Sequence, residues 1–136
     1  MLIEPFANNE HHAAVIAGWL RGEWEIDPQE TRGFLPAMAD RPAALVALID
    51  SQPVGVLAYR RRQEAFQSRI ELWVNVVFVA PEFRRQGIAR ALVQQGSDPA
   101  YVAPAKQLFA YTDVPTLYEQ CGWRPLIYNA VCLDLT

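Results

Sequence analysis

The run VFVAPEFRRQGIARAL, from Val77 to Leu92, constrains the fold of this chain more than any other segment. It begins with apolar residues typical of a strand, and Pro81 ends that strand because proline has no N–H to donate to a sheet. Apolar residues at helical spacing follow Gly87. A strand that enters a helix through the letters RRQGIA leaves several backbone N–H groups unpaired at the positive end of the helix dipole.

The turn between this strand and helix has the features of an anion-binding site. Arg84 and Arg85 contribute positive charge, while Gly87 and Ala89 have little or no side chain to keep a ligand away from the backbone. A bound phosphate or pyrophosphate needs this combination of free N–H groups and close approach. An ordinary helix start with two solvated arginines is the alternative, and the turn taken alone leaves both interpretations open.

The overall charge makes a local basic turn informative. The chain of 136 residues has a net charge of −3 and a pI near 5.3. Such a chain has no general positive field, so we expect no nucleic acid among its partners. Its 51% hydrophobic and 20% charged residues are typical of a globular protein. The length fits one domain, residues 1–136.

Apolar patterning along the chain predicts strands that alternate with helices. Strands are expected at 2–6, 44–49, 54–59, 70–79, 106–112 and in the tail 123–135. Helices are expected after Asn8 or Asn9 as far as Gly22, from about 86 to 95, and from 112 or 113 to 121. Residues 22–42 read as a loop with one short helix, and 60–68 as a connection. This order predicts an α/β (α+β) protein with helices packed on a mixed sheet.

Neither the start of the sequence nor its cysteines suggest an exported protein. The segment MLIEPFANNEHH has no basic leader and no long apolar stretch, so we expect no signal peptide, no membrane association and a cytoplasmic location. Cys121 and Cys132 lack the spacing of metal ligands, and we expect no metal cofactor. Both cysteines are expected to be reduced, packed thiols; a disulfide or a catalytic thiol is the alternative.

Two motifs together resemble the GNAT (Gcn5-related) N-acetyltransferase family. VAPEFRRQGIA matches the pattern V-x-P-x-x-R-x-x-G-x-G/A of the acyl-CoA-binding core, and LYEQCGW is similar to the last helix of the family with its Tyr-x-x-x-Gly-aromatic ending. The expected strand order is also that of the family. The resemblance implies the GNAT fold, with a mostly antiparallel sheet, flanking helices and splayed central strands. It implies transfer of the acetyl group of acetyl-CoA to a primary amine by direct attack in a ternary complex.

By this resemblance, acetyl-CoA is a co-substrate that the turn and the preceding strand hold. Backbone N–H groups from Arg85 to Ala89 would bind its pyrophosphate, and Phe78 and Val79 would bond the pantetheine arm as an added strand does. A backbone N–H near Val79 would stabilise the oxyanion. The expected acetyl-CoA contacts are Val77, Phe78, Val79, Arg84, Arg85, Gln86, Gly87, Ile88 and Ala89.

The resemblance also supplies two candidates for proton transfer. Tyr118 matches the tyrosine of the family's last helix and is the candidate general acid for the leaving thiolate; a tyrosine that only packs on the sheet is the alternative. Glu71 lies early in the central strand, where some relatives carry a catalytic base. A carboxylate that pairs with Arg69 or Arg60 is the alternative for Glu71, and a water relay would make a base unnecessary.

The segment WLRGEWEIDPQE is expected to line the acceptor site. Trp19 and Trp24 lie beside Glu23 and Glu25, and carboxylates with aromatic walls suit a cationic amine on a small molecule or a peptide. A solvated acidic loop is the alternative. Exposed aromatic residues such as Trp123, Tyr128 and Phe66 would mark either a homodimer surface or the core. The arginine run 60–62 either reaches the CoA 3′-phosphate or is only solvated.

Two departures from the family pattern keep a second function open. The segment QQGSDPAYVAP cuts the helix after the basic turn short, and TDVPT stands where many relatives place an asparagine before the last helix. A non-catalytic CoA-binding or protein-interaction module on the GNAT fold would keep the anion site without needing Tyr118. An unrelated nucleotide binder is disfavoured because the chain lacks G-x-G-x-x-G and G-K-S/T patterns.

Overall fold

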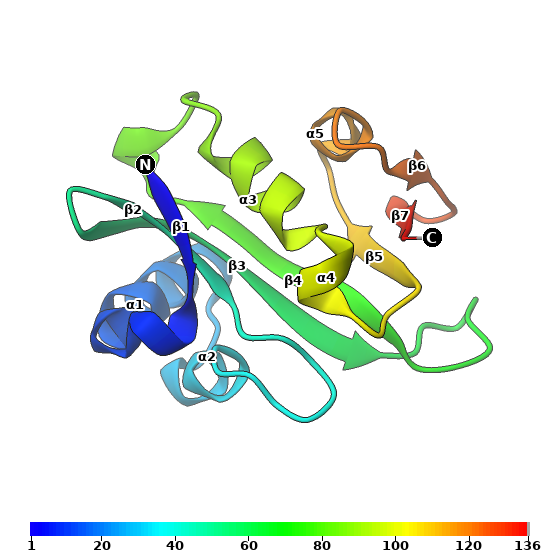
Figure 1. Ribbon diagram of the computed structural model, residues 1–136, viewed down its shortest axis with the longest axis horizontal. Helices are drawn as coiled ribbons and strands as arrows, with labels where there is room; N and C mark the ends of the chain where they lie inside the picture. Colours follow the sequence, from blue (N-terminus) through cyan, green and yellow to red (C-terminus); the bar gives the residue numbers. More distant parts are fainter. Residues whose placement is uncertain (136) are drawn as a thin grey trace.

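The computed structural model describes residues 1–135 and contains one seven-stranded sheet of order β1-β2-β3-β4-β5-β7-β6 (Figure 1). All described neighbours are antiparallel except β4 and β5, which are parallel. This arrangement confirms the predicted mixed, mostly antiparallel sheet. The strands are β1 (Leu2–Pro5), β2 (Leu45–Ile49), β3 (Gln52–Arg62), β4 (Glu71–Val79), β5 (Gln107–Tyr111), β6 (Arg124–Pro125) and β7 (Ala130–Asp134).

Helices cover both faces of the sheet because alternate strand residues are apolar on both sides. In β2, Leu45 and Ala47 pack with Ile88 and Leu92 of α3 (Ile88–Gly96), whereas Val46 belongs to a second cluster formed with α1 (Ala13–Trp24) and α2 (Pro28–Phe34). Two short helices complete the set, α4 (Pro99–Val102) and α5 (Pro115–Glu119). The strands between these layers are therefore buried on both faces, as their near-continuous apolar sequences indicate.

Several predicted boundaries are wrong, and three of them have a clear physical reason. Asn9 does not cap a helix: its side chain donates to the carbonyl of Pro5, and two 3-10 turns precede α1. Helix α1 does not end at Gly22 but continues to Trp24, where Glu25 adopts a left-handed φ of 56°. Residues 60–62 are not a connection, because they extend β3 by pairing with the first residues of β4. Sheet pairing thus overrides the polar character of the arginine run.

A β-bulge at Asn75 divides β4 into two parts. Ala58 pairs with Val76 and Tyr59 pairs with Val74, so Asn75 has no partner on β3. An extra residue reverses the alternation of side chains. Val74 therefore packs on the α3 side of the sheet, while Val76 packs on the α1 side.

The two parallel strands separate immediately before this bulge. Their pairing is limited to Leu72 with Leu108 and Trp73 with Phe109, and β4 continues to Val79 without β5 beside it. Figure 1 shows β5 leaving the line of β4 toward α5. The splay that the family resemblance implied is therefore present, and it leaves one edge of β4 free over its second half.

Close packing fixes the position of α3 on the sheet. The hydroxyl of buried Tyr59 donates to the carbonyl of Gly96 at 2.7 Å, and a Cβ on Gly96 would lie 2.9 Å from Leu57 Cδ1 and from the Tyr59 hydroxyl. The chain then turns, and Asp98 caps α4 by accepting from the N–H of Ala100. The helix after the basic turn is therefore short, as the letters QQGSDP predict.

Replacing Gly96 by alanine is expected to destabilise the protein by about 1–3 kcal/mol, because the new methyl group has no room between Leu57 and Tyr59. Gly18→Ala in α1 is the matched control: a Cβ there meets nothing within 4 Å, and the change should stabilise the fold by about 0.4–1 kcal/mol. Urea denaturation measures both. Equal unfolding free energies for Gly96→Ala and the parent would show that α3 does not pack tightly against Leu57 and Tyr59.

Candidate active site

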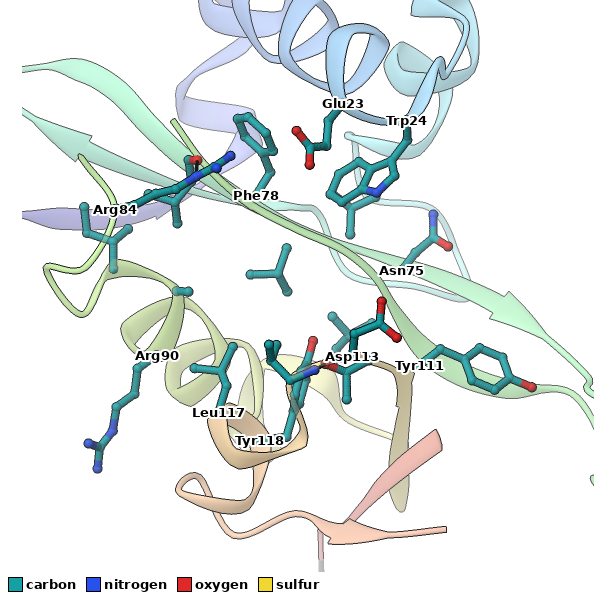
Figure 2. A pocket seen from close by; sticks show the side chains of 18 of the residues that line it. Glu23, Trp24, Asn75, Phe78, Arg84, Arg90, Tyr111, Asp113, Leu117 and Tyr118 are labelled. Atoms are coloured by element: carbon teal, nitrogen blue, oxygen red, sulfur yellow. Dashed lines mark hydrogen bonds between the residues drawn. The ribbon is translucent and has the colours of Figure 1, made fainter. Parts of the chain in front are cut away.

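A cleft of about 1010 Å³ opens where β4 and β5 separate. Its volume suits a ligand the size of a small cofactor. One wall is the free edge of β4, one is the turn before α3, one is the segment from the end of β5 into α5, and the rim includes the end of α1 (Figure 2). Of the residues expected to contact acetyl-CoA, the cleft is lined by Val77, Phe78, Val79, Arg84, Arg85, Gly87, Ile88 and Ala89.

The turn before α3 presents free backbone donors to this cleft. Arg85 and Gly87 have left-handed φ angles of 65° and 80°, which turn the chain twice before the helix begins. Within residues 1–135, the N–H groups from Arg85 to Arg90 donate neither to a side chain nor to a carbonyl outside α3; the first bond that reaches back is from Ala91 to Gly87. Successive unpaired donors at a helix N-terminus form an anion site.

Gly87 also keeps the floor of this turn open. A Cβ built there meets nothing within 4 Å, so the space above it is empty and faces the cleft. Gln86 is exposed and its side chain does not line the cleft, so only its backbone N–H remains a candidate contact. The residues present thus fit a diphosphate such as that of CoA.

Arg84 is held against the end of β4. Its Nε donates to the carbonyl of Val79 at 2.9 Å, and its guanidinium carbon lies 5.4 Å from the centre of the Phe78 ring. The arginine is therefore not a freely solvated charge. Its cation is fixed at the junction between the β4 edge and the anion site.

The backbone of β4 faces the cleft at Val77 and Val79 but not at Phe78, which was also expected to bond the pantetheine arm. Ala80 donates to the carbonyl of Val54 on β3, so the Val79 carbonyl on the other side of that trans peptide faces the cleft. The Phe78 carbonyl instead points at Gly55 of β3. Because N–H and C=O of a strand residue point the same way, Val77 and Val79 offer backbone groups to a ligand, whereas Phe78 offers only its ring.

Tyr118 lies at the back of the cleft. Its side chain is only 5% exposed and packs edge-on against Trp123 with ring centres 5.0 Å apart. Burial raises the pKa of Tyr118 to about 12, with a smaller contribution from Cys121. No hydrogen bond of its hydroxyl is found among the described residues, and the side chain lines the cleft (Figure 2). The phenol is therefore a protonated donor with nothing in the protein to donate to.

Glu71 does not reach this cleft. It is the first residue of β4, on the far side of the Asn75 bulge, and its carboxylate accepts from Arg69 Nε at 2.9 Å. It is absent from the cleft lining within the described chain. The structure therefore favours the ion-pair alternative over a role as base.

Only part of the expected acceptor segment lies at the cleft. Glu23 and Trp24, at the end of α1, line its rim, and Figure 2 shows both above β4. Trp19 lies behind Phe78, with ring centres 5.5 Å apart, and does not line the cleft. Glu25, which has a left-handed conformation at the helix end, is exposed and does not line the cleft. Of the two expected residues that do not line the cleft, Trp19 packs against Phe78 and Glu25 is a solvated carboxylate.

Sequence reasoning missed several polar or aromatic residues of the lining, among them Asn75, Tyr111, Asp113 and Tyr128. Asn75 is the one amide in the apolar strand ELWVNVVFV, a signal of the bulge that could have been used. The sequence offers Thr112 or Asp113 as the start of the last helix, but the N-cap of α5 is Val114 and has no side-chain cap. Thr112 Oγ1 accepts from the N–H of Val114 in the turn before the helix. Tyr128 is 72% exposed, whereas Trp123 is buried. The sequence alone could not decide which of these two aromatic residues belongs to the surface and which to the core.

The rest of the described chain offers few other chemical groups. Cys121 and Cys132 are free thiols. Residues 1–135 contain no cluster of three or more His, Cys, Asp or Glu side chains that could hold a metal ion. No helix in this part of the chain is both long and apolar enough to span a membrane.

Comparison with known proteins places this geometry in context. The model of the acetyltransferase (GNAT) domain matches residues 40–125, well over half of the chain. The N-acetyltransferase YafP of Escherichia coli (strain K12), itself uncharacterized, is 43% identical over 49 residues, which are 36% of this chain and 26% of that protein. The match thus spans about a quarter of that relative.

Solved structures share the fold over nearly the whole chain. An aminoglycoside 6′-N-acetyltransferase complexed with coenzyme A superimposes with a TM-score of 0.76 and 14% identity, covering 100% of this chain and 98% of that one. A chain of the NatC complex bound to Gag peptide and CoA gives a TM-score of 0.75 and 18% identity, covering 99% and 98%. The matched domain, the splayed sheet and the anion-binding turn agree, and this chain belongs to the acetyltransferase (GNAT) family.

Proposed function

We propose that this protein transfers the acetyl group of acetyl-CoA directly to a primary amine, with both substrates bound in one ternary complex. The single observation that carries the proposal is the cleft itself. It joins a row of free N–H groups at one end to the unpartnered hydroxyl of Tyr118 at the strand splay. A site that only bound CoA would have no need for a buried, protonated phenol there.

The chain's own groups divide the work of the reaction. The turn from Arg85 to Ala89 holds the diphosphate, and the outward N–H groups of Val77 and Val79 orient the pantetheine arm and stabilise the oxyanion. The amine nitrogen attacks the thioester carbon, a C–N bond forms, and the C–S bond breaks. Tyr118 gives its proton to the thiolate. The nitrogen loses two protons, one to solvent before attack and one afterwards that restores the phenol.

The protonation state of the amine sets the main barrier. An alkylamine with a pKa of about 10.4 is ~3.4 units above neutral pH, so its neutral form costs about 4.6 kcal/mol. No histidine lines the cleft within residues 1–135, and Glu71 is turned elsewhere. The proposal therefore assigns the first deprotonation to water at the cleft mouth rather than to a dedicated base.

The acceptor is proposed to be a small-molecule or peptide amine. Solved relatives include one named for an aminoglycoside and one bound to a peptide, which supports either. We also propose a cytoplasmic location, which the two free thiols support, and a homodimer. We likewise predict that the protein uses no metal cofactor and binds no nucleic acid.

Thiol release from acetyl-CoA in the presence of a panel of primary amines tests the proposed function. We expect free CoA to form only when an accepted amine is present, with N-acetylated product seen by mass spectrometry. Release without an amine would indicate hydrolysis, and tight acetyl-CoA binding without turnover of any amine would favour the non-catalytic module. A covalent acetyl-protein intermediate would contradict direct transfer.

A further inference from the structure

Two carboxylates line the cleft without a role in binding acetyl-CoA, Glu23 at the rim and Asp113 at the strand splay. Asp113 follows the end of β5 and lines the cleft where the strands separate, and Figure 2 shows its carboxylate turned toward the cleft. No ion pair or side-chain hydrogen bond engages this carboxylate within the described residues. A carboxylate beside a thioester site repels the anionic co-substrate, so its position needs another explanation.

The neighbours of Asp113 favour a cation. Tyr128 lines the same cleft, and aromatic faces attract cations. The Tyr111 ring, in contrast, stacks on Trp73 with ring centres 4.9 Å apart and already has Arg62 over it at 5.2 Å. Asn75 faces the cleft from the bulge, and no hydrogen bond is found for its amide in residues 1–135. An alkylammonium group has three N–H donors, which the Asp113 carboxylate and the Asn75 carbonyl oxygen can accept.

Tyr118 gives an independent sign that a ligand belongs at this place. It is nine-tenths buried, its hydroxyl lacks a partner in the described chain, and it faces the same cleft as Asp113. Nearby positive charge does not neutralise Asp113. Arg62, which lies over the Tyr111 ring outside the cleft lining, is paired with Glu64 at 2.7 Å. The cationic residues of the lining, Arg84, Arg85 and Arg90, all lie in the turn before α3 or in its first residues.

We propose that Asp113 binds the ammonium group of the acceptor, so that this protein selects amines that are protonated at neutral pH over amines that are neutral. This inference rests on the proposed function. It names the acceptor class as alkylamines and excludes arylamines as preferred substrates. Asp113 thus determines specificity by charge, while Tyr118 acts on the leaving thiolate.

Steady-state kinetics on Asp113→Asn test the assignment with a panel of alkylamines, including benzylamine, and with aniline as the neutral amine. For alkylamines the substitution is expected to raise KM about tenfold with little change in kcat, because an attraction worth about 1.4 kcal/mol is lost. The KM for aniline should be unchanged. Glu119→Gln, an exposed charge on α5 outside the cleft lining, is the matched control and should alter neither.

Binding separates failure of this inference from failure of the proposed function. Calorimetric titration of benzylamine into the CoA-loaded protein should show weaker binding in Asp113→Asn than in the parent, whether or not turnover occurs. Equal effects of the substitution on benzylamine and aniline, or no benzylamine binding by the CoA-loaded parent, would overturn the role of Asp113. Amine binding that depends on Asp113 in a protein without turnover would instead overturn only the proposed transfer.

Discussion

Gly87→Glu is expected to abolish acetyl-CoA binding, with a loss of at least about a hundredfold in affinity, or about 3 kcal/mol. The glycine lies at the centre of the free N–H groups, and a Cβ there would point into open space above the turn. A glutamate side chain would fill that space and place a carboxylate where a diphosphate should bind. Close like charges in a partly enclosed site repel strongly. Calorimetric titration with acetyl-CoA measures the effect.

Backbone strain at this position needs its own control. The φ of 80° at Gly87 is a left-handed conformation, which costs a non-glycine residue about 1–2 kcal/mol. Gly87→Ala carries this strain with neither bulk nor charge, so it should lose stability but keep most of its acetyl-CoA affinity. Retention of micromolar binding in Gly87→Glu would show that the turn does not hold the diphosphate. Equal losses in both variants would attribute the effect to strain.

Tyr118→Phe is expected to lower kcat by about 10²–10³ while leaving acetyl-CoA affinity intact. The change removes one hydroxyl for which no hydrogen bond is found in the described structure, and the ring keeps its contact with Trp123. The fold should therefore be undisturbed, and thermal unfolding of the variant checks this. Unchanged kcat in Tyr118→Phe would show that water protonates the thiolate and that Tyr118 only packs.

The pH profile gives a second readout of the same residue. With a pKa of about 12, the phenol stays protonated through the neutral and mildly alkaline range. The rate should therefore rise with pH as the amine loses its proton, and no falling limb from Tyr118 is expected below about pH 11. A falling limb near pH 8–9 that disappears in Tyr118→Phe would contradict the raised pKa.

The parts of the site that were predictable from sequence are those built by adjacent residues. Pro81 must end a strand, and Gly87 permits a left-handed turn before the helix, so the anion-binding turn follows from a dozen consecutive letters. Tyr118 was predictable from the resemblance because its helix follows the last central strand at a fixed distance. Each of these features depends on local conformation, which the chain specifies without reference to distant segments.

Tertiary structure alone decided which side chains enter the cleft. Glu71 and Asn75 lie four positions apart in one strand, yet only Asn75 lines the site, because the pairing with β5 ends between them and the bulge falls at Asn75. Asp113 reaches the cleft only because β5 separates from β4. Strand separation and bulges depend on pairing between residues far apart in the chain. Local sequence patterns do not show which distant residues will pair. The sequence therefore determined the anion-binding turn, and the folded sheet determined the acceptor side of the cleft.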